Sequence, residues 1–130
     1  MKTTTTWKEK HRFDSRQDEK SFMIDGDREQ GPGPKSLLLS GLAGCSGIDV
    51  VDILEKMRVE FSDLIIEAES EQTEDHPKVF TDILLTYHIK TVAENENKVR
   101  KAIELSLDKY CGVAAMLKKN SPVRYELVLE

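Results

Sequence analysis

Two cysteines are the residues of this 130-residue chain with the most distinctive chemistry. Cys45 stands between Gly44 and Ser46, whose small side chains leave its sulfur approachable, and Cys111 directly follows Tyr110. A thiolate is a nucleophile that oxidises to a sulfenic acid or a disulfide, yet free cysteine is also among the most buried residue types. From the residue types alone, both a reactive and a structural interpretation of these thiols stay open.

The surroundings of the two cysteines set conditions on their chemistry. A disulfide between Cys45 and Cys111 requires a fold that brings their Cα atoms within about 7 Å. Asp49 lies one helical turn after Cys45, and its negative charge opposes a thiolate there. A reactive Cys45 therefore needs a cation from elsewhere in the protein.

Other residue combinations are weaker indications of chemistry. The three histidines, His11, His76 and His88, show neither zinc-finger spacing with the cysteines nor an HExxH motif, so no metal site is expected. Asp49 and Asp52 lie three residues apart in an apolar segment. They are either general acid and base partners or internal polar groups with satisfied hydrogen bonds, and the second interpretation is favoured.

Composition excludes several classes of function. The chain has 24 acidic and 19 basic residues and a net charge of −5, which argues against a strongly basic nucleic-acid binder. The longest charge-free apolar stretch, residues 36–48, is shorter than the roughly 20 residues that cross a membrane. No export signal is apparent at the amino terminus. A cytoplasmic location with reduced thiols is therefore expected.

The sequence pattern predicts one domain over residues 1–130. Its expected elements are strands within 1–30, a helix over 34–58 with Cys45, a hairpin over 59–91, a helix over 96–119 with Cys111, and a strand over 122–129. The first helix is apolar on nearly every face, which predicts that protein surrounds it. The second helix is amphipathic, so it should lie on a sheet or on a partner surface.

Three motifs resemble the OsmC/Ohr superfamily, and most closely its YhfA-like branch. They are GPGPKSLLL at 31–39, LAGCSGIDVV at 42–51 and LSLDKYCGVAAML at 105–117. The order of a Pro-rich loop, a Cys helix, a hairpin, a Tyr-Cys helix and a final strand is also similar, and the resemblance covers residues 31–129.

The resemblance implies an α+β fold with antiparallel sheets around two long central helices. It also implies an intertwined homodimer with active sites at the subunit interface. Members of the superfamily are thiol-dependent peroxidases that reduce organic hydroperoxides without metal or flavin, using an external dithiol reductant. By this resemblance Cys45 matches the peroxidatic cysteine and Cys111 the resolving cysteine, with a disulfide between them as the oxidised product.

The chain also departs from the pattern of the peroxidatic members. Lys35 and Ser36 stand where those members carry an acid, and the activating arginine is Arg12, Arg16 or Arg28 or is missing. The alternative hypothesis is a non-catalytic or regulatory dimer that binds a small apolar ligand. A third is a structural dimer with inert cysteines.

Overall fold

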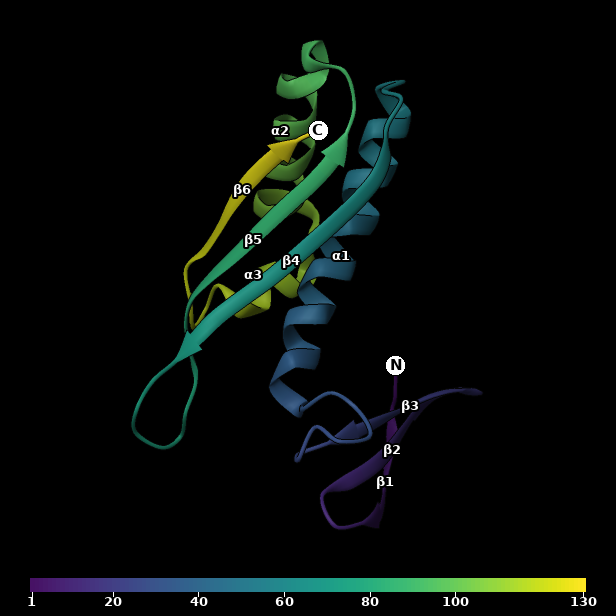
Figure 1. Ribbon diagram of the computed structural model, residues 1–130, viewed down its shortest axis with the longest axis vertical. Helices are drawn as coiled ribbons and strands as arrows, with labels where there is room; N and C mark the ends of the chain where they lie inside the picture. Colours follow the sequence, from purple (N-terminus) through teal and green to yellow (C-terminus); the bar gives the residue numbers. More distant parts are fainter. The chain divides into compact units, whose positions relative to one another are not determined.

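The computed structural model describes residues 1–130. The chain divides into two compact units, Met1–Leu39 and Ser40–Glu130. Each unit contains one three-stranded sheet, and the helices follow the first sheet in the chain (Figure 1). The fold is mixed α+β, as the sequence predicts.

The first unit is an antiparallel meander of three strands. Its strands are β1 (Thr4–Glu9), β2 (Arg12–Gln17) and β3 (Lys20–Asp25), paired in that order. Trp7 lies opposite Phe13, and Phe13 lies opposite Ile24 on the same face of the sheet. Trp7 and Phe13 are exposed, so within the unit this apolar face is not covered.

A buried carboxylate organises the loop that follows β3. Asp25 is completely buried and accepts hydrogen bonds from the backbone N–H groups of Gln30 and Asp27 at 2.9 Å and Glu29 at 3.2 Å. The guanidinium of Arg12 lies 3.4 Å away. The Gln30 bond above all, with the other two bonds and Arg12, holds the pKa of the Asp25 carboxyl below its ordinary value, against the opposing effect of burial.

This arrangement predicts acid sensitivity of the first unit. A carboxyl with a lowered folded-state pKa contributes stability that is complete above its unfolded pKa of about 4 and is lost as pH falls through the lower folded value. Asp25→Asn should weaken this dependence. Thermal unfolding of both proteins followed by circular dichroism from neutral to acidic pH tests it, and an unchanged acid slope in the variant would contradict the role of Asp25.

The second unit packs helices against a mixed sheet. Strands β4 (Ser62–Gln72) and β5 (Phe80–Lys90) form an antiparallel hairpin, and β6 (Val123–Leu129) pairs with β5 in parallel. The prediction of purely antiparallel sheets is thus wrong for β6. Parallel neighbours need a crossover of a dozen or more residues, and the helical segment between β5 and β6 supplies it.

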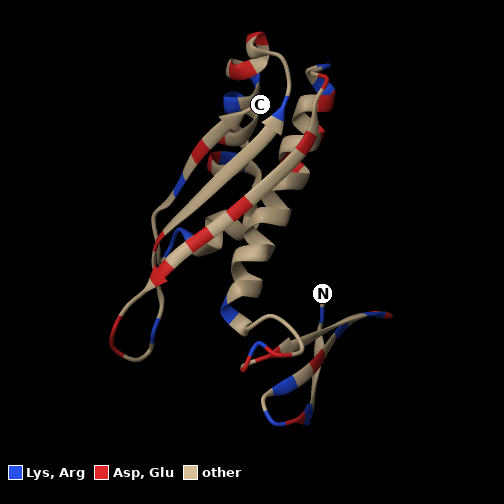
Figure 2. Cartoon of the chain, viewed as in Figure 1, with Lys and Arg blue, Asp and Glu red and all other residues tan.

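Alternation along β5 builds the core of the second unit. Every second residue of the strand is buried against the helices; these are Ile83, Leu85, Tyr87 and Ile89. The opposite face of the sheet is polar, with acidic residues spaced along β4 (Figure 2). The hairpin predicted over residues 59–91 corresponds to β4 and β5.

The Cys45 helix, α1 (Pro34–Lys56), differs from its prediction in its end and in its burial. It ends two residues before the predicted Arg58, which has a positive φ of 58° that helices do not adopt. Only a stripe at every fourth position is buried, comprising Leu42, Ser46, Val50 and Leu54. Ile48 is 66% exposed. Within one chain, then, the prediction that protein surrounds this helix is wrong.

By length and composition α1 is also able to cross a membrane. It has 23 residues, and its most apolar window reaches a mean hydropathy of 1.7, with 22% of that window buried. The helix is longer than the charge-free stretch 36–48 because it also includes charged residues, and a spanning helix tolerates isolated charges. A core helix of a water-soluble protein passes the same test, so α1 alone does not indicate a membrane protein.

The predicted second helix is broken at Cys111. A short 3₁₀ turn, η1 (Ala93–Asn95), leads into α2 (Glu96–Leu105), followed by the π-helical turn η2 (Ser106–Tyr110) and by α3 (Gly112–Leu117). Cys111 is extended, with ψ of 105°, and its sulfur accepts a hydrogen bond from the N–H of Ala114. A residue that caps a new helix cannot continue the previous one, so the single helix over 96–119 is corrected to two.

Core packing predicts a large effect of one substitution in β5. Leu85→Ala removes a completely buried side chain and should lower the free energy of unfolding by about 2–5 kcal/mol. Ile65→Ala on the outer face of β4, where the side chain is 58% exposed, is the matched control, with about 0.5 kcal/mol or less expected. Urea unfolding of both variants measures the difference, and equal losses would contradict this core.

Candidate active site

The fold brings the two cysteines together. Cys45 lies half-buried on α1, and Cys111 is buried where η2 meets α3. Cys45 lies close enough to Cys111 to raise the pKa of its thiol, and neither cysteine is in a disulfide. The two thiols are therefore neighbours in the fold, while their pairing in a disulfide and the roles assigned to the two sulfurs stay predictions.

The backbone around Cys111 fixes its thiol. The N–H of Cys111 donates to the carbonyl of Ser106 at 2.7 Å, which closes the π-helical turn. The N–H of Ala114 donates to the Cys111 sulfur at 3.3 Å. Single π-helical turns are frequent at functional sites because they redirect one side chain out of the helical repeat.

Burial keeps Cys111 protonated. The pKa of the Cys111 thiol is raised to about 11, chiefly by burial and to a lesser extent by the neighbouring Cys45 and Asp49, against the opposing effect of the Ala114 N–H. Cys111 is therefore a thiol at neutral pH, and it must lose its proton before it can form a disulfide.

A buried chain of hydroxyl groups runs beside the thiols. Ser46 lies 2.6 Å from the Tyr87 hydroxyl, and Ser106 lies 2.9 Å from both Ser46 Oγ and Asp49 Oδ2. Ser46, Ser106 and Tyr87 are completely buried. This chain joins α1, β5 and η2, the three elements that enclose the thiol pair.

Tyr87, at one end of the chain of hydroxyl groups, stays neutral. Burial raises the pKa of Tyr87 to about 12, and the nearby Cys111 and Asp49 add to the effect, whereas the Ser46 bond opposes it. Its ring packs edge-to-face on Tyr125, with centroids 6.1 Å apart. Tyr87 therefore keeps its hydroxyl hydrogen throughout the neutral range.

A cavity opens next to these hydroxyl groups, between α1 and the α2–η2 segment. Its volume is about 540 Å³, and its lining consists of Asp49, Asp52, Ile53, Lys56, Met57, Leu105 and Tyr110. Asp49 belongs both to this lining and to the hydroxyl chain. The cavity has room for a small, largely apolar molecule beside that carboxylate.

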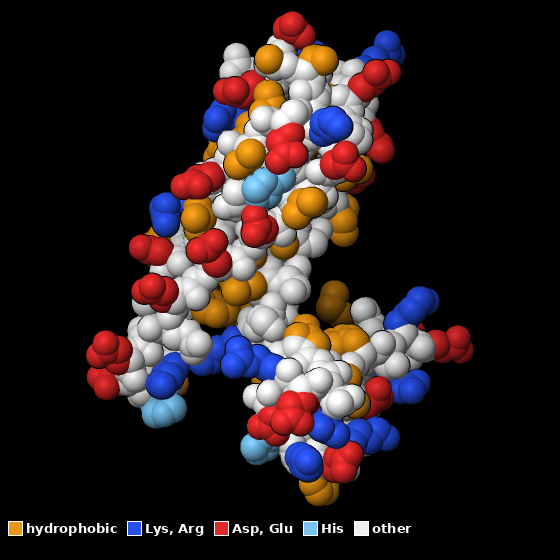
Figure 3. Space-filling view, viewed as in Figure 1, with side chains coloured by type: hydrophobic (Ala, Val, Ile, Leu, Met, Phe, Trp, Pro, Cys, Tyr) orange, Lys and Arg blue, Asp and Glu red, His pale blue; other side chains and the backbone are white.

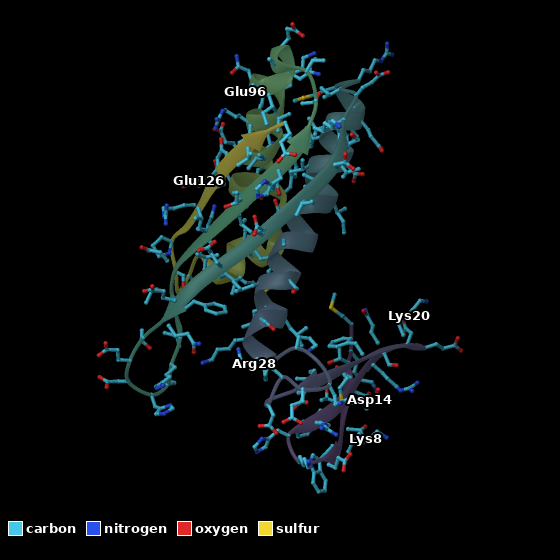
Figure 4. The ribbon with its side chains drawn as sticks, viewed as in Figure 1. Lys8, Asp14, Lys20, Arg28, Glu96 and Glu126 are labelled. Carbon is cyan, nitrogen blue, oxygen red and sulfur yellow. The ribbon has the colours of Figure 1, made fainter.

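The residues expected to activate Cys45 belong to the first unit. Arg12 is engaged by carboxylates of Glu9, Asp25 and Glu29, and Arg16 by Asp14. Arg28, the third candidate, lies on the loop after β3 (Figure 4).

Ser36, which stands where the peroxidatic members carry an acid, lies in the first turn of α1. Its hydroxyl donates to the carbonyl of Gly33 at 2.8 Å. No group of three or more His, Cys, Asp or Glu side chains in the structure is arranged to hold a metal ion.

Ser46, Ser106 and Tyr87 are the site residues that sequence reasoning missed. The sequence indicates Ser46 only as a small neighbour of Cys45, and it gives no site role to Ser106 or Tyr87. The available signal was a serine close to each cysteine within an apolar stretch, where a buried hydroxyl needs a partner.

Comparison with known proteins agrees with the fold and the motifs. The family described as OsmC-like protein matches residues 25–126. Protein YhfA of Escherichia coli strain K12 is 37% identical over 110 residues, which cover 82% of each chain. The crystal structure of a hypothetical protein from Aquifex aeolicus VF5 has a TM-score of 0.85 at 30% identity, covering 99% of this chain and 96% of that one.

A more distant structure shares the fold alone. The organic hydroperoxide resistance protein OhrB of Bacillus subtilis has a TM-score of 0.67 at 19% identity, with 98% of this chain and 96% of that chain covered. Because the family match spans most of the sequence and includes both cysteine motifs, this chain belongs to the OsmC-like protein family.

Proposed function

We propose that this protein is a thiol-dependent peroxidase that reduces organic hydroperoxides in the cytoplasm. The observation that carries the proposal is that the fold brings Cys45 and Cys111, from two distant parts of the chain, close enough for Cys45 to raise the pKa of the Cys111 thiol. The family includes proteins named for organic hydroperoxide resistance, which supports the same substrate class.

The exposure of the two sulfurs gives each a different task. Cys45 is the more accessible, so its thiolate attacks one oxygen of the hydroperoxide. The O–O bond breaks, Cys45 becomes a sulfenic acid, and the alcohol leaves. Cys111 then attacks the Cys45 sulfur, forming the disulfide and releasing water. An external dithiol restores both thiols by two exchange steps and is itself oxidised to a disulfide. No metal or flavin takes part.

The cysteine assignments predict different outcomes for two substitutions. Cys45→Ser should abolish dithiol-dependent consumption of tert-butyl hydroperoxide, because the attacking sulfur is gone. Cys111→Ser should still form a sulfenic acid at Cys45 but no internal disulfide. Peroxide assays and mass spectrometry after trapping with dimedone measure both, and consumption by Cys45→Ser at the wild-type rate would overturn the proposal.

The apolar cavity supports a second candidate function. A non-catalytic or regulatory dimer that binds a small apolar ligand would use the same space beside Ile53, Met57 and Leu105. It would bind such a ligand whether Cys45 is present or replaced by serine. Peroxide turnover by the wild type therefore separates the two functions.

We propose that the working form is a homodimer in which a second copy covers α1. Gly41 and Gly44 point into open space, with no atom within 4 Å of where a Cβ would lie, and Ile48 is 66% exposed on the same side of the helix. In the space-filling view, apolar side chains reach the surface among the charged ones (Figure 3). Contact surfaces of this kind are buried in obligate dimers.

Disruption of this face should separate the subunits. Ile48→Asp places a charge where the second copy packs, so it should shift the protein from dimer to monomer in sedimentation velocity experiments. Ile65→Asp, on the outer face of β4, is the matched control and should leave the dimer intact. A wild-type protein that sediments as a monomer, or an Ile48→Asp variant that stays dimeric, would contradict the proposal.

A further inference from the structure

Asp49 is the carboxyl group that belongs both to the cavity lining and to the surroundings of the cysteine pair. It lies one turn after Cys45 on α1, lines the cavity, and is bound by the hydroxyl of Ser106 at 2.9 Å. Ser106 in turn holds Cys111, whose N–H donates to the Ser106 carbonyl at 2.7 Å. One buried residue therefore fixes both Asp49 and Cys111.

The number of hydroxyl hydrogens determines how the hydroxyl chain is oriented with respect to Asp49. Ser106 Oγ lies within reach of three acceptors, namely Asp49 Oδ2, Ser46 Oγ and the Ser46 carbonyl, but a hydroxyl has a single hydrogen. With Asp49 ionised, the carboxylate is the strongest of these acceptors. The hydrogens between the other members of the chain then come from Ser46 and Tyr87. The whole chain is oriented toward the carboxylate.

The surroundings of the Cys111 thiol contain one competent proton acceptor. The titratable groups that interact with it are Cys45 and Asp49 on α1 and Tyr87 on β5. Tyr87 stays neutral and Cys45 is the partner sulfur of the reaction. None of these groups is a cation that could stabilise a Cys111 thiolate directly.

We infer that Asp49 is the general base of the resolving step, taking the proton of the Cys111 thiol as its sulfur attacks the oxidised Cys45. This inference rests on the proposed peroxidase function. Ser106 is a positioning residue, because it acts through the orientation of the carboxylate.

The step balances in atoms and electrons. The Cys111 S–H bond breaks and its proton passes to Asp49, while the sulfur electron pair forms the bond to Cys45 sulfur and the S–O bond of the sulfenic acid breaks. The departing hydroxide takes the proton from Asp49 and leaves as water. Cys111 sulfur is oxidised and the sulfenic sulfur of Cys45 is reduced to the disulfide level.

Loss of the base should change the pH profile of the resolving step. Without Asp49, attack depends on the small thiolate fraction of Cys111, because burial, the largest cause of the raised pKa of this thiol, remains. The rate should then rise about tenfold for each pH unit below the pKa of the thiol, whereas the wild-type rate should be much less dependent on pH. A merely structural role for Asp49 would lower the rate without changing this slope.

The test compares the wild type with Asp49→Asn, each reduced and then mixed with tert-butyl hydroperoxide over a range of pH. Acid-quenched samples and dimedone-trapped samples are resolved by mass spectrometry into sulfenic acid and disulfide. At neutral pH, Asp49→Asn should form the Cys45 sulfenic acid at the wild-type rate and form the disulfide about 10²-fold or more slowly. Glu55→Gln, which removes an exposed acid from α1, is the matched control and should behave as the wild type.

Two further measurements keep the result independent of folding defects. Asp49→Ala with added formate should recover part of the disulfide rate, because a free carboxylate can replace the missing base. Ser106→Ala, which retains the carboxylate, should slow the step while keeping the wild-type pH slope.

Disulfide formation by Asp49→Asn at the wild-type rate and slope would overturn the assignment of Asp49 alone. Slow formation with an unchanged slope and no formate rescue would do the same. A wild-type protein that forms no sulfenic acid at Cys45 would instead overturn the peroxidase function, and this assignment with it.

Discussion

The hydroxyl of Ser106 is the contact on which the geometry of this protein depends. Through it the π-helical turn is tied to Ser46 and Asp49 on α1, and through Ser46 to Tyr87 in the central strand. A buried hydroxyl without a partner costs about 1–3 kcal/mol, and no buried side-chain nitrogen or oxygen in the structure lacks one. These hydrogen bonds therefore favour one arrangement of α1, β5 and η2, in which Cys45 lies near Cys111.

This constraint explains why polar groups occupy the most apolar part of the chain. Leucine or valine at the position of Ser46 would fit the buried stripe of α1, which otherwise consists of Leu42, Val50 and Leu54. Apolar contacts are not directional, however, and they tolerate small sliding motions of one helix along another. Directed hydrogen bonds fix the rotation of α1 about its axis, which a contact between two thiols requires.

Much of this architecture could be predicted from the sequence. Periodicity predicts α1, the hairpin and the final strand, because each has one uniform environment along its length. The break at Cys111 could not be predicted, since the cap depends on a hydrogen bond to sulfur that leaves no pattern in the sequence. The parallel pairing of β6 also escaped, because alternation predicts a strand but not its direction.

The site was predictable only in part, for a related reason. The resemblance to the OsmC/Ohr superfamily indicated both cysteines, whereas Ser106 and Tyr87 act through contacts between residues far apart in the chain. Spacing along a helix or strand shows which residues share a face, and Asp49 could be related to Cys45 in this way. It does not show which residue of another element meets that face.

The unequal burial of the two sulfurs would set the order of steps in the proposed peroxidase reaction. In the proposed reaction a hydroperoxide would reach the half-exposed Cys45 before the buried Cys111, and burial keeps Cys111 in its less reactive thiol form. If both cysteines were exposed, either could be oxidised first, and the sulfenic acid could form away from the hydroxyl chain. Burial of the second thiol thus protects it until its partner has reacted, but the same burial makes its proton harder to remove. A fold that hides the resolving thiol must also supply a route for that proton, and the carboxylate beside the cavity lies where such a route would begin.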